Sequence, residues 1–185
     1  MIYLAFPATG MGEEVLIYAK QNCQALILDE LTYTNQSFES LFLKVMFTST
    51  TLTIGTVYRP PSNSHNINDF IDEFKNKILN MLPSSNCAIF GDINIDTLNN
   101  SAQISNFITE MSSKGFFNLM DHPTRVHLDD DSNTISSTLI DHIWTSCHNI
   151  ESSFVLNYHL TDHYPIGCSI DLPLNNEKHK KISKN

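Results

Sequence analysis

The chain has 185 residues, 41% of them hydrophobic, which predicts one domain with a sizeable core. No apolar run approaches the roughly 20 residues of a membrane span, and the opening MIYLAFPATG lacks the basic segment of a signal peptide. We therefore expect an intracellular protein, nuclear or cytoplasmic, that has no membrane partner.

The formal net charge is −9, and it is unevenly spread. Residues 175–185 hold four of the eleven Lys and Arg residues, so residues 1–174 hold seven basic and nineteen acidic residues, a balance of −12. An acidic body is a poor match for duplex DNA, whose affinity depends on Lys and Arg contacts to phosphate. We expect residues 1–174 to form the domain and residues 175–185 to be a basic, disordered tail.

The four cysteines show no CxxC spacing, and three of them lie in apolar, strand-like stretches. We expect free thiols in a reducing compartment, with disulfides or a zinc site as the alternatives. The four are Cys23, Cys87, Cys147 and Cys168.

The first third of the chain predicts β-strands. Apolar and aromatic runs with partial alternation lie at 13–20, 23–30, 37–47 and 51–58, closely enough spaced for an antiparallel meander. The two prolines after Arg59 end this run, because proline cannot donate to a sheet ladder.

Two amphipathic helices follow, predicted at 66–83 and 101–115. Asn66 or Asn68 can cap the first helix, and Pro83 and Gly115 are the expected stops. The apolar stripe of the first comprises Ile67, Phe70, Ile71, Phe74, Ile78 and Leu82, and that of the second Ile104, Phe107, Ile108 and Met111.

Further strands are expected between and after the helices, at 87–90, 116–121, 138–146, 152–160 and 161–172. Residues 121–138 form a long acidic stretch, which we expect to be a functional or mobile loop. Strands interleaved with helices in this way predict an α+β fold, with packed sheets and helices outside them.

The stretch GDINID at 91–96 carries the first candidate site. Side chains two residues apart in an extended segment point the same way, so Asp92 and Asn94 can converge while Ile93 and Ile95 anchor the other face. A carboxylate beside an amide suits a hard cation or an attacking water. The alternative is an Asx-rich turn.

Two Asp-His pairs and a Tyr-Arg pair are further candidates. In TLIDHIW, Asp141 could orient a histidine elsewhere; in LTDHYPI, Asp162 could bind a metal and His163 a phosphate or proton. In VYRPP, Tyr58 and Arg59 could bind phosphoryl oxygens. Taken singly, each could equally be an exposed polar pair, a turn or a core aromatic.

Taken in order, VYRPP, GDINID, TLIDHI and TDHYPI resemble the endonuclease/exonuclease/phosphatase superfamily, and within it the apurinic-type endonuclease domain of non-LTR retrotransposons. FES at 38–40 and PTR at 123–125 add to the likeness, which covers about residues 12–172. The resemblance implies a four-layer α/β sandwich of two mainly antiparallel sheets flanked by helices. It implies a DNA endonuclease that needs Mg²⁺ or Mn²⁺, with a C-terminal reverse transcriptase domain as partner in the full-length element.

The resemblance also implies residue roles. Asp92 and Asn94 match the pair that activates the attacking water, His163 the base or charge stabiliser at the phosphate, and Asp141 the carboxylate bonded to that histidine. Asp96 has only a local role in the turn. The implied metal ligands are Asp162 and Asp92, and the implied phosphate ligands are Tyr58, Arg59, Asn94 and His163. Thr161 replaces the usual serine before the Asp-His pair and keeps the hydroxyl.

The sequence departs from the family at its front. Family members begin with a strand that ends in asparagine, then a helix and a strand with a metal-binding glutamate; here Glu13 and Glu14 fall where the family has a glycine-rich turn. We therefore expect a fold that lacks the first strand-helix-strand unit, an exposed sheet edge, and weak or absent activity. The alternatives are a truncated non-catalytic remnant and a superfamily phosphatase for a phospholipid or nucleotide.

Overall fold

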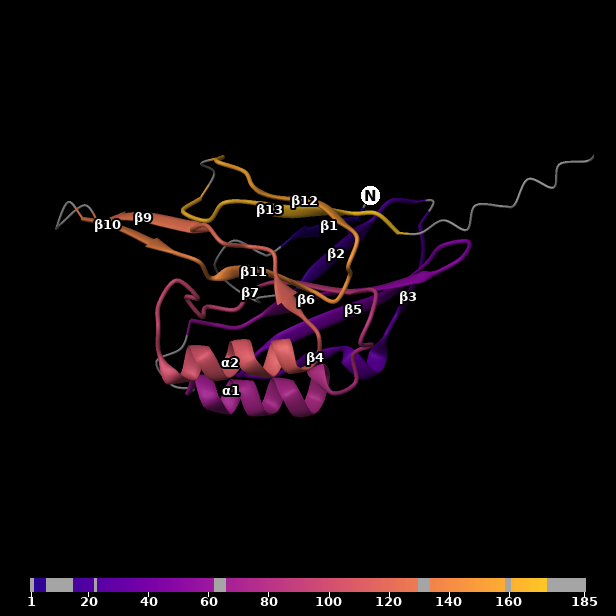
Figure 1. Cartoon of the computed structure of the whole chain (residues 1–185), viewed down its shortest axis with the longest axis horizontal. Helices are drawn as coiled ribbons and strands as arrows, with labels where there is room; N and C mark the ends of the chain where they lie inside the picture. Colours follow the sequence, from indigo (N-terminus) through magenta and orange to yellow (C-terminus); the bar gives the residue numbers. More distant parts are fainter. Residues whose placement is uncertain are drawn as a thin grey trace, which may run out of the picture.

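A seven-stranded sheet forms the centre of the protein (Figure 1). The computed structural model describes residues 2–5, 15–21, 23–61, 66–129, 134–158 and 161–172. The strand order is β3-β5-β6-β7-β11-β8, with β4 paired to β5. The strands are β3 (Gln24–Ile27), β4 (Tyr33–Thr34), β5 (Glu39–Met46), β6 (Thr51–Tyr58), β7 (Cys87–Asp92), β8 (Phe117–Asn118) and β11 (Asp141–Thr145).

The predicted meander is confirmed for β3, β5 and β6, which pair antiparallel in chain order. The predicted strand at 23–30 ends earlier, at Ile27, and a 3₁₀ turn follows at Asp29–Leu31. The pairing of β6 with β7 is parallel, so the chain must cross over between them.

The crossover contains α1 (Ile67–Phe74), which continues as a π-helical turn at Lys75–Leu79. Asn66 caps α1, because its side chain accepts a hydrogen bond from the N–H of Asn68. The helix ends at Leu79, ahead of the expected stop at Pro83.

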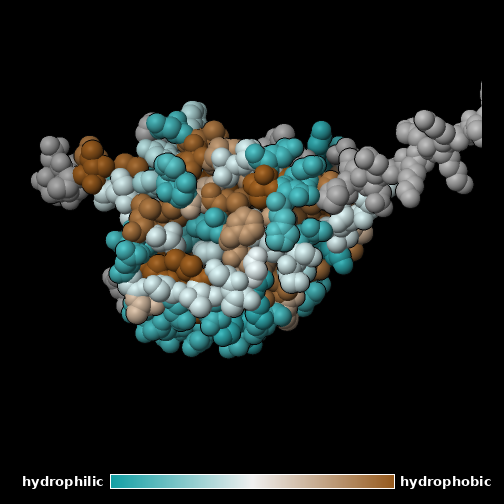
Figure 2. Space-filling model, viewed as in Figure 1, coloured by the Kyte–Doolittle hydropathy of each residue, from teal (hydrophilic) through white to brown (hydrophobic). Residues whose placement is uncertain are grey.

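The second helix is α2 (Ala102–Ser113), capped by the Ser101 hydroxyl and followed by Gly115 at φ +81°. Both helices cover one face of the central sheet (Figure 1). Their apolar stripes meet the sheet in a core rich in phenylalanine, and their outward surface is hydrophilic (Figure 2). Ile108, expected on the buried stripe, is instead 37% exposed. Phe107 points into the core, and Ile108, the next residue round the helix axis, lies at the margin of the buried face.

The opposite face of the central sheet is covered by strands. The antiparallel pairs are β1 (Ile2–Ala5) with β2 (Leu16–Ala19), and β12 (Ile150–Val155) with β13 (Ile166–Ile170). Because β6 is covered on both sides, residues 52–57 are all buried. The fold is α+β, a sandwich in which the described helices lie on one side, the central sheet in the middle and the small sheets on the other side.

The prediction of a loop at 121–138 is wrong. Here β9 (Arg125–Asp129) and β10 (Thr134–Thr138) pair antiparallel and project from the body of the protein as a hairpin (Figure 1). The acidic residues of this stretch obscured a short polar-apolar alternation that favours a strand. Leu128 and Ile135 face each other across the hairpin and are 52% and 70% exposed.

Several expectations concern residues outside the described part, namely Glu13, Glu14 and the tail at 175–185. All four cysteines are free thiols, as predicted; two of them, Cys87 and Cys147, are buried. Among the described residues, no helix is both long and apolar enough to cross a membrane.

Candidate functional site

Two acidic side chains lie opposite each other where two central strands meet. β7 ends at Asp92, β11 begins at Asp141, and the antiparallel register pairs these two residues. Strand alternation sends Cys87 and Ile89 to the helix-covered core, so Asp92 lies on the other, strand-covered face. Two carboxylates are thus held side by side at one edge of the fold.

Gly91 allows β7 to reach this position. A Cβ atom there would lie 1.9 Å from the carbonyl oxygen of Val57 on β6, an impossible contact. The glycine therefore serves a close backbone approach.

The chain turns directly after Asp92. Ile93 and Ile95 are each 1% exposed and anchor the turn, as predicted. Asn94 adopts φ +50°, a left-handed conformation that asparagine tolerates well, and its N–H donates to Asp92 Oδ1 at 3.2 Å. Asp92 and Asn94 are therefore linked, and both are half-buried.

Asp96 has the local role expected of it. Its carboxylate accepts hydrogen bonds from the N–H of Leu98 at 3.2 Å and of Leu139 at 2.9 Å. It thereby fastens the turn after β7 to the segment that leads into β11.

Arg59 contacts the backbone of the turn after β7, and its role as a phosphate ligand stays a prediction. Its side chain is buried, donates to the carbonyl oxygens of Ile93 at 3.4 Å and Asn94 at 3.1 Å, and lies over the ring of Phe70. Its own carbonyl accepts from Asn94 Nδ2 at 2.7 Å. Burial lowers the pKa of Arg59, while nearby Asp92 acts in the opposite direction. Arg59 thus supports the turn that carries Asn94.

Tyr58 ends β6 beside Asp92. The parallel register of β6 and β7 continues to a hydrogen bond from the N–H of Arg59 to the carbonyl of Asp92, at 2.9 Å. This register places Tyr58 level with Asp92, and level residues of paired strands point to the same face. The predicted role of Tyr58 at the phosphate is compatible with this position.

Asp141 and His163 form a hydrogen-bonded dyad. His163 Nδ1 lies 3.0 Å from Asp141 Oδ2 and 3.1 Å from Oδ1. The Asp141 side chain is 8% exposed and that of His163 33%. The hydrogen bond that His163 donates to Asp141 raises the pKa of His163, and burial acts in the opposite direction. The charges of Asp92 and Asp162 raise this pKa further.

A short irregular segment at 161–164 presents His163. Thr161 Oγ1 accepts a hydrogen bond from the N–H of His163 at 3.0 Å, so the hydroxyl that replaces serine here shapes the turn. With Nδ1 engaged by Asp141, the Nε2 atom is the nitrogen available to a substrate.

Asp162, an expected metal ligand, points elsewhere. Its Oδ2 accepts from Arg125 Nε at 2.6 Å, and His127 Nδ1 lies 3.9 Å away. Burial alone would raise the pKa of Asp162, but the hydrogen bond and charge of Arg125 outweigh it and the pKa is lowered. The metal role of Asp162 stays a prediction.

Within the described part of the chain, the residues grouped closely enough to hold a metal ion are Asp92, Asp141 and His163, whose ligand atoms all lie within 4.8 Å of one another. Burial, together with the neighbouring charge of Asp141, raises the pKa of Asp92 to about 7. Such a carboxylate pair needs a nearby cation to be stable in its ionised form. The two carboxylates of this group suit Mg²⁺ or Mn²⁺, which prefer oxygen ligands.

Thr124 and Arg125 belong to the site although the motif reasoning gave them no role. Thr124 is fully buried, and its hydroxyl accepts from the N–H groups of Ile140 and Asp141. Arg125 forms the ion pair with Asp162 described above. The sequence contains these two residues in the PTR motif, which indicated a likeness to the family but suggested no chemical role for them.

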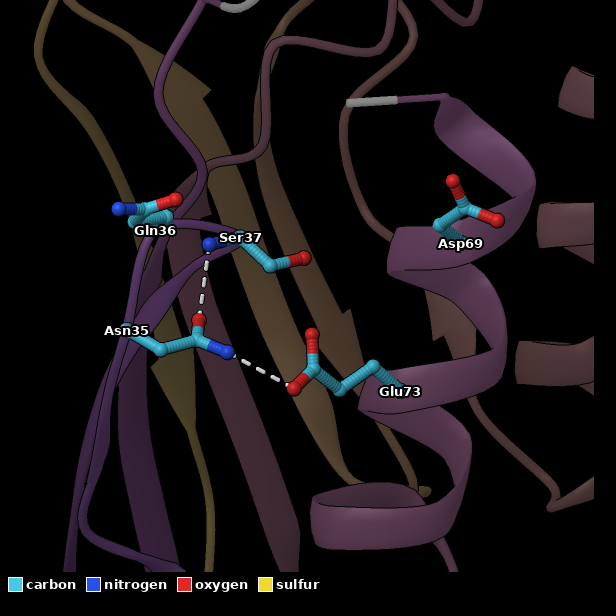
Figure 3. Close-up of a pocket in the computed structure, with 5 residues that line it drawn as sticks. All are labelled: Asn35, Gln36, Ser37, Asp69 and Glu73. Carbon is cyan, nitrogen blue, oxygen red and sulfur yellow. Dashed lines mark hydrogen bonds between the residues drawn. The ribbon is translucent and has the colours of Figure 1, made fainter. Parts of the chain in front are cut away.

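A hollow of about 350 Å³ lies away from these residues (Figure 3). There Asn35 Nδ2 donates to Glu73 Oε1 at 2.8 Å and joins the segment before β5 to α1. Its lining residues are Asn35, Gln36, Ser37, Asp69 and Glu73, none of them a predicted site residue.

Three solved structures show the same fold. The endonuclease domain of TRAS1, a telomere-specific non-LTR retrotransposon, is 13% identical over 92% of this chain and 80% of its own, with a TM-score of 0.72. D. rerio TDP2, solved with a single-strand DNA product, is 15% identical over 93% of this chain and 77% of its own, with a TM-score of 0.56. The inositol polyphosphate 5-phosphatase domain of synaptojanin, solved with inositol (1,4)-bisphosphate and calcium, is 15% identical over 90% of this chain and 61% of its own, with a TM-score of 0.55.

No protein-family model matches the sequence, and no curated protein sequence does so either. The chain has the fold of the endonuclease/exonuclease/phosphatase superfamily, as its motifs predicted. Fold alone does not decide between the nucleases and the phosphatases that share it, so the activity must be argued from the site.

Proposed function

We propose that this chain is a divalent-metal-dependent phosphodiester hydrolase that acts on DNA, an endonuclease of the non-LTR retrotransposon type. The observation that carries the proposal is the Asp141–His163 dyad, with 3.0 Å between Nδ1 and Oδ2, beside the half-buried Asp92. The likeness of its fold to the TRAS1 endonuclease domain supports the choice of a nuclease.

The dyad fixes the orientation of His163. Asp141 accepts a hydrogen bond from Nδ1–H and stabilises the charged imidazole, so that Nε2 can stabilise negative charge at a phosphate or move a proton there. The raised pKa of His163 keeps it cationic further into the neutral range, which favours the charge-stabilising role.

Asp92 is suited to accept a proton from the attacking water. A general base works best with a pKa near the working pH. Without a bound cation, burial and the charge of Asp141 raise the pKa of Asp92 to about 7. Asn94 holds Asp92 Oδ1 through its backbone N–H, and Tyr58 lies level with Asp92 on β6. These two residues would orient the water and the phosphate.

A divalent cation would be held by Asp92 and Asp141. The metal role of Asp162, whose carboxylate is paired with Arg125, stays a prediction. The ion supplies neutralisation of the phosphodiester oxygens and of the leaving group. The cation would also stabilise the protein, because it relieves the repulsion between the paired carboxylates.

The charge of the chain limits its affinity for DNA. With −12 over residues 1–174, few phosphate contacts are available, and binding should be weak and strongest at low salt. A C-terminal reverse transcriptase domain, as partner in the full-length element, is part of the proposal and would supply further DNA contacts.

Nicking of supercoiled plasmid tests the proposal, at low salt with Mg²⁺ or Mn²⁺. We expect slow nicking that Asp141→Asn reduces by roughly 10² to 10⁴, because the amide cannot hold the imidazole in the same tautomer and charge state. Asp121→Asn is the matched control, since the Asp121 side chain is 85% exposed and should leave the rate unchanged.

Other outcomes would replace the proposal. Nicking that survives Asp141→Asn would assign the activity to something other than this dyad. Phosphate release from a phosphoinositide or nucleotide, with plasmid left intact, would favour the phosphatase alternative. Folded protein with neither activity nor Mn²⁺ binding would identify a non-catalytic remnant.

A further inference from the structure

The base of the β9–β10 hairpin touches both partners of the dyad. Thr124 Oγ1 accepts hydrogen bonds from Ile140 N at 3.2 Å and from Asp141 N at 3.0 Å. The carbonyl of Thr124 accepts from the N–H of Tyr164 at 2.7 Å, one residue after His163. One buried residue therefore spans the two chain segments that must meet for the dyad to form.

Arg125 adds a second connection to the same segment. Its Nε donates to Asp162 Oδ2 at 2.6 Å, and its backbone lies opposite His163 in the β-bridge to which the Tyr164–Thr124 bond belongs. The next residue, Val126, donates its N–H to the carbonyl of Asp162 at 2.9 Å. Backbone and side chain of the hairpin thus hold the histidine segment from one side.

We propose that Thr124 and Arg125 form a clasp that positions His163 against Asp141, with Arg125 acting as a positioning residue through Asp162. Segment 161–164 has no regular strand of its own. Besides the internal bond of Thr161 to His163, the clasp supplies hydrogen bonds from another part of the chain that hold it. The part of this inference that concerns turnover rests on the proposed function, but the geometry of the dyad can be tested without it.

Loss of the ion pair between Arg125 and Asp162 should have a large effect on the geometry of the dyad and a small effect on the folding free energy. The side chains of Arg125 and Asp162 are 39% and 34% exposed, and partly exposed ion pairs add little to folding free energy. A displacement of about 1 Å at a reacting group, in contrast, can lower turnover by about 10²-fold. Loss of the pair should therefore disturb the dyad without unfolding the protein.

The test compares Arg125→Ala, Arg125→Lys and Lys75→Ala in the full chain. Lys75 pairs with Glu110 at 2.8 Å and with similar side-chain exposure, and it joins α1 to α2, so it is a matched control. The first readout is the NMR tautomer of His163 in metal-free protein at alkaline pH, where the neutral ring in the wild type should carry its proton on Nδ1. The second is the hydrolysis of a simple phosphodiester, bis(p-nitrophenyl) phosphate, with Mn²⁺.

For Arg125→Ala we expect a mixed tautomer signal and a kcat at least tenfold lower with KM changed by less than about twofold. Arg125→Lys should restore part of both, because a lysine can still reach Asp162, and Lys75→Ala should change neither. A wild-type tautomer signal in folded Arg125→Ala would overturn the proposal.

A second pair of variants keeps the inference testable if Arg125→Ala does not fold. Thr124→Val removes the hydroxyl acceptor and should shift the tautomer, whereas Thr124→Ser should not; equal signals would overturn the clasp. If wild-type protein hydrolyses nothing, the proposed function fails, and the tautomer signals still decide whether the clasp exists.

Discussion

Of the three Asp-His dipeptides in the sequence, those at 141–142 and 162–163 lie at the candidate site, and the fold treats these two in opposite ways. From the first pair only the aspartate enters the site, and from the second the histidine does, so the dyad joins Asp141 to His163. Each remaining partner lies elsewhere: His142 is fully buried, and Asp162 pairs with Arg125.

Backbone conformation explains the difference. The first pair lies in β11, where successive side chains point to opposite faces of the sheet. Asp141 therefore points to the strand-covered face, while His142 packs beside Phe107 and Trp144 on the helix side. The second pair lies in an irregular segment without that alternation, so contacts to Asp141 and Arg125 set the two directions.

The largest expected effect is the loss of activity on replacing His163, compared with replacement of His142. His163→Ala removes the imidazole that faces the phosphate and should lower phosphodiester hydrolysis by roughly 10² to 10⁴, with little change in thermal midpoint. His142→Ala should show the reverse, with a lower thermal midpoint and kcat per folded molecule within about twofold of wild type. Plasmid nicking and thermal unfolding of both proteins check this, and equal rate losses in the two variants would contradict the different roles.

A smaller effect, on the free energy of unfolding, is expected from the hydrogen bonds of the buried His142. His142 Nε2 lies 3.1 Å from the carbonyl of Leu139, and its Nδ1 accepts from Trp144 Nε1 at 3.1 Å, an arrangement that needs the neutral ring. Burial lowers the pKa of His142 accordingly. Conservative replacement by His142→Leu leaves the Trp144 N–H unpaired and should cost about 1 to 3 kcal/mol of unfolding free energy, measured by urea denaturation. An unchanged free energy of unfolding would mean that the hydrogen bonds of the imidazole add no net stability.

The same contrast shows what sequence reasoning could reach. Motif order selected Asp92, Asn94, Asp141 and His163 as candidates. The register of β7 and β11 brings Asp92 beside Asp141, about 50 positions later in the chain, while the catalytic roles stay predictions. Sequence could not supply the partner of Asp162, because that pairing depends on a hairpin hidden in an acidic stretch. Long-range partners of an irregular segment follow from tertiary contacts, which have no local pattern.

The contacts of Arg59 could not be predicted from the sequence for a related reason. An arginine after a strand-end tyrosine has the chemistry of a phosphate ligand, but its surroundings decide whether the side chain points outward. Here the turn after β7 presents two carbonyls to its guanidinium, and Phe70 of α1 covers it. The helix that the apolar stripe predicted thus covers the guanidinium of Arg59.

The smallest expected effect is a pH dependence of stability at Asp92. The pKa of Asp92 is about 7 in the folded protein and near its ordinary value of 3.8 when unfolded, mainly because of burial and the charge of Asp141, which outweigh His163 and Arg125. Between these values the folded state binds more protons, so this group's contribution to stability is present at pH 4 and is lost as the pH rises through 7. Asp92→Asn should therefore match wild type near pH 4 and exceed it by about 1 to 3 kcal/mol at pH 8 in EDTA.

Urea denaturation of both proteins from pH 4 to pH 8 measures this difference, and taking it between two proteins cancels the contribution of groups such as His142. Mg²⁺ or Mn²⁺ at pH 8 should stabilise the wild type more than Asp92→Asn, because only the wild type offers the second carboxylate. A stability difference that does not change with pH would show that Asp92 is ionised normally in the fold. In that case the half-buried carboxylate would be paired with His163 strongly enough to offset its burial, and the argument for Asp92 as the proton acceptor would fail.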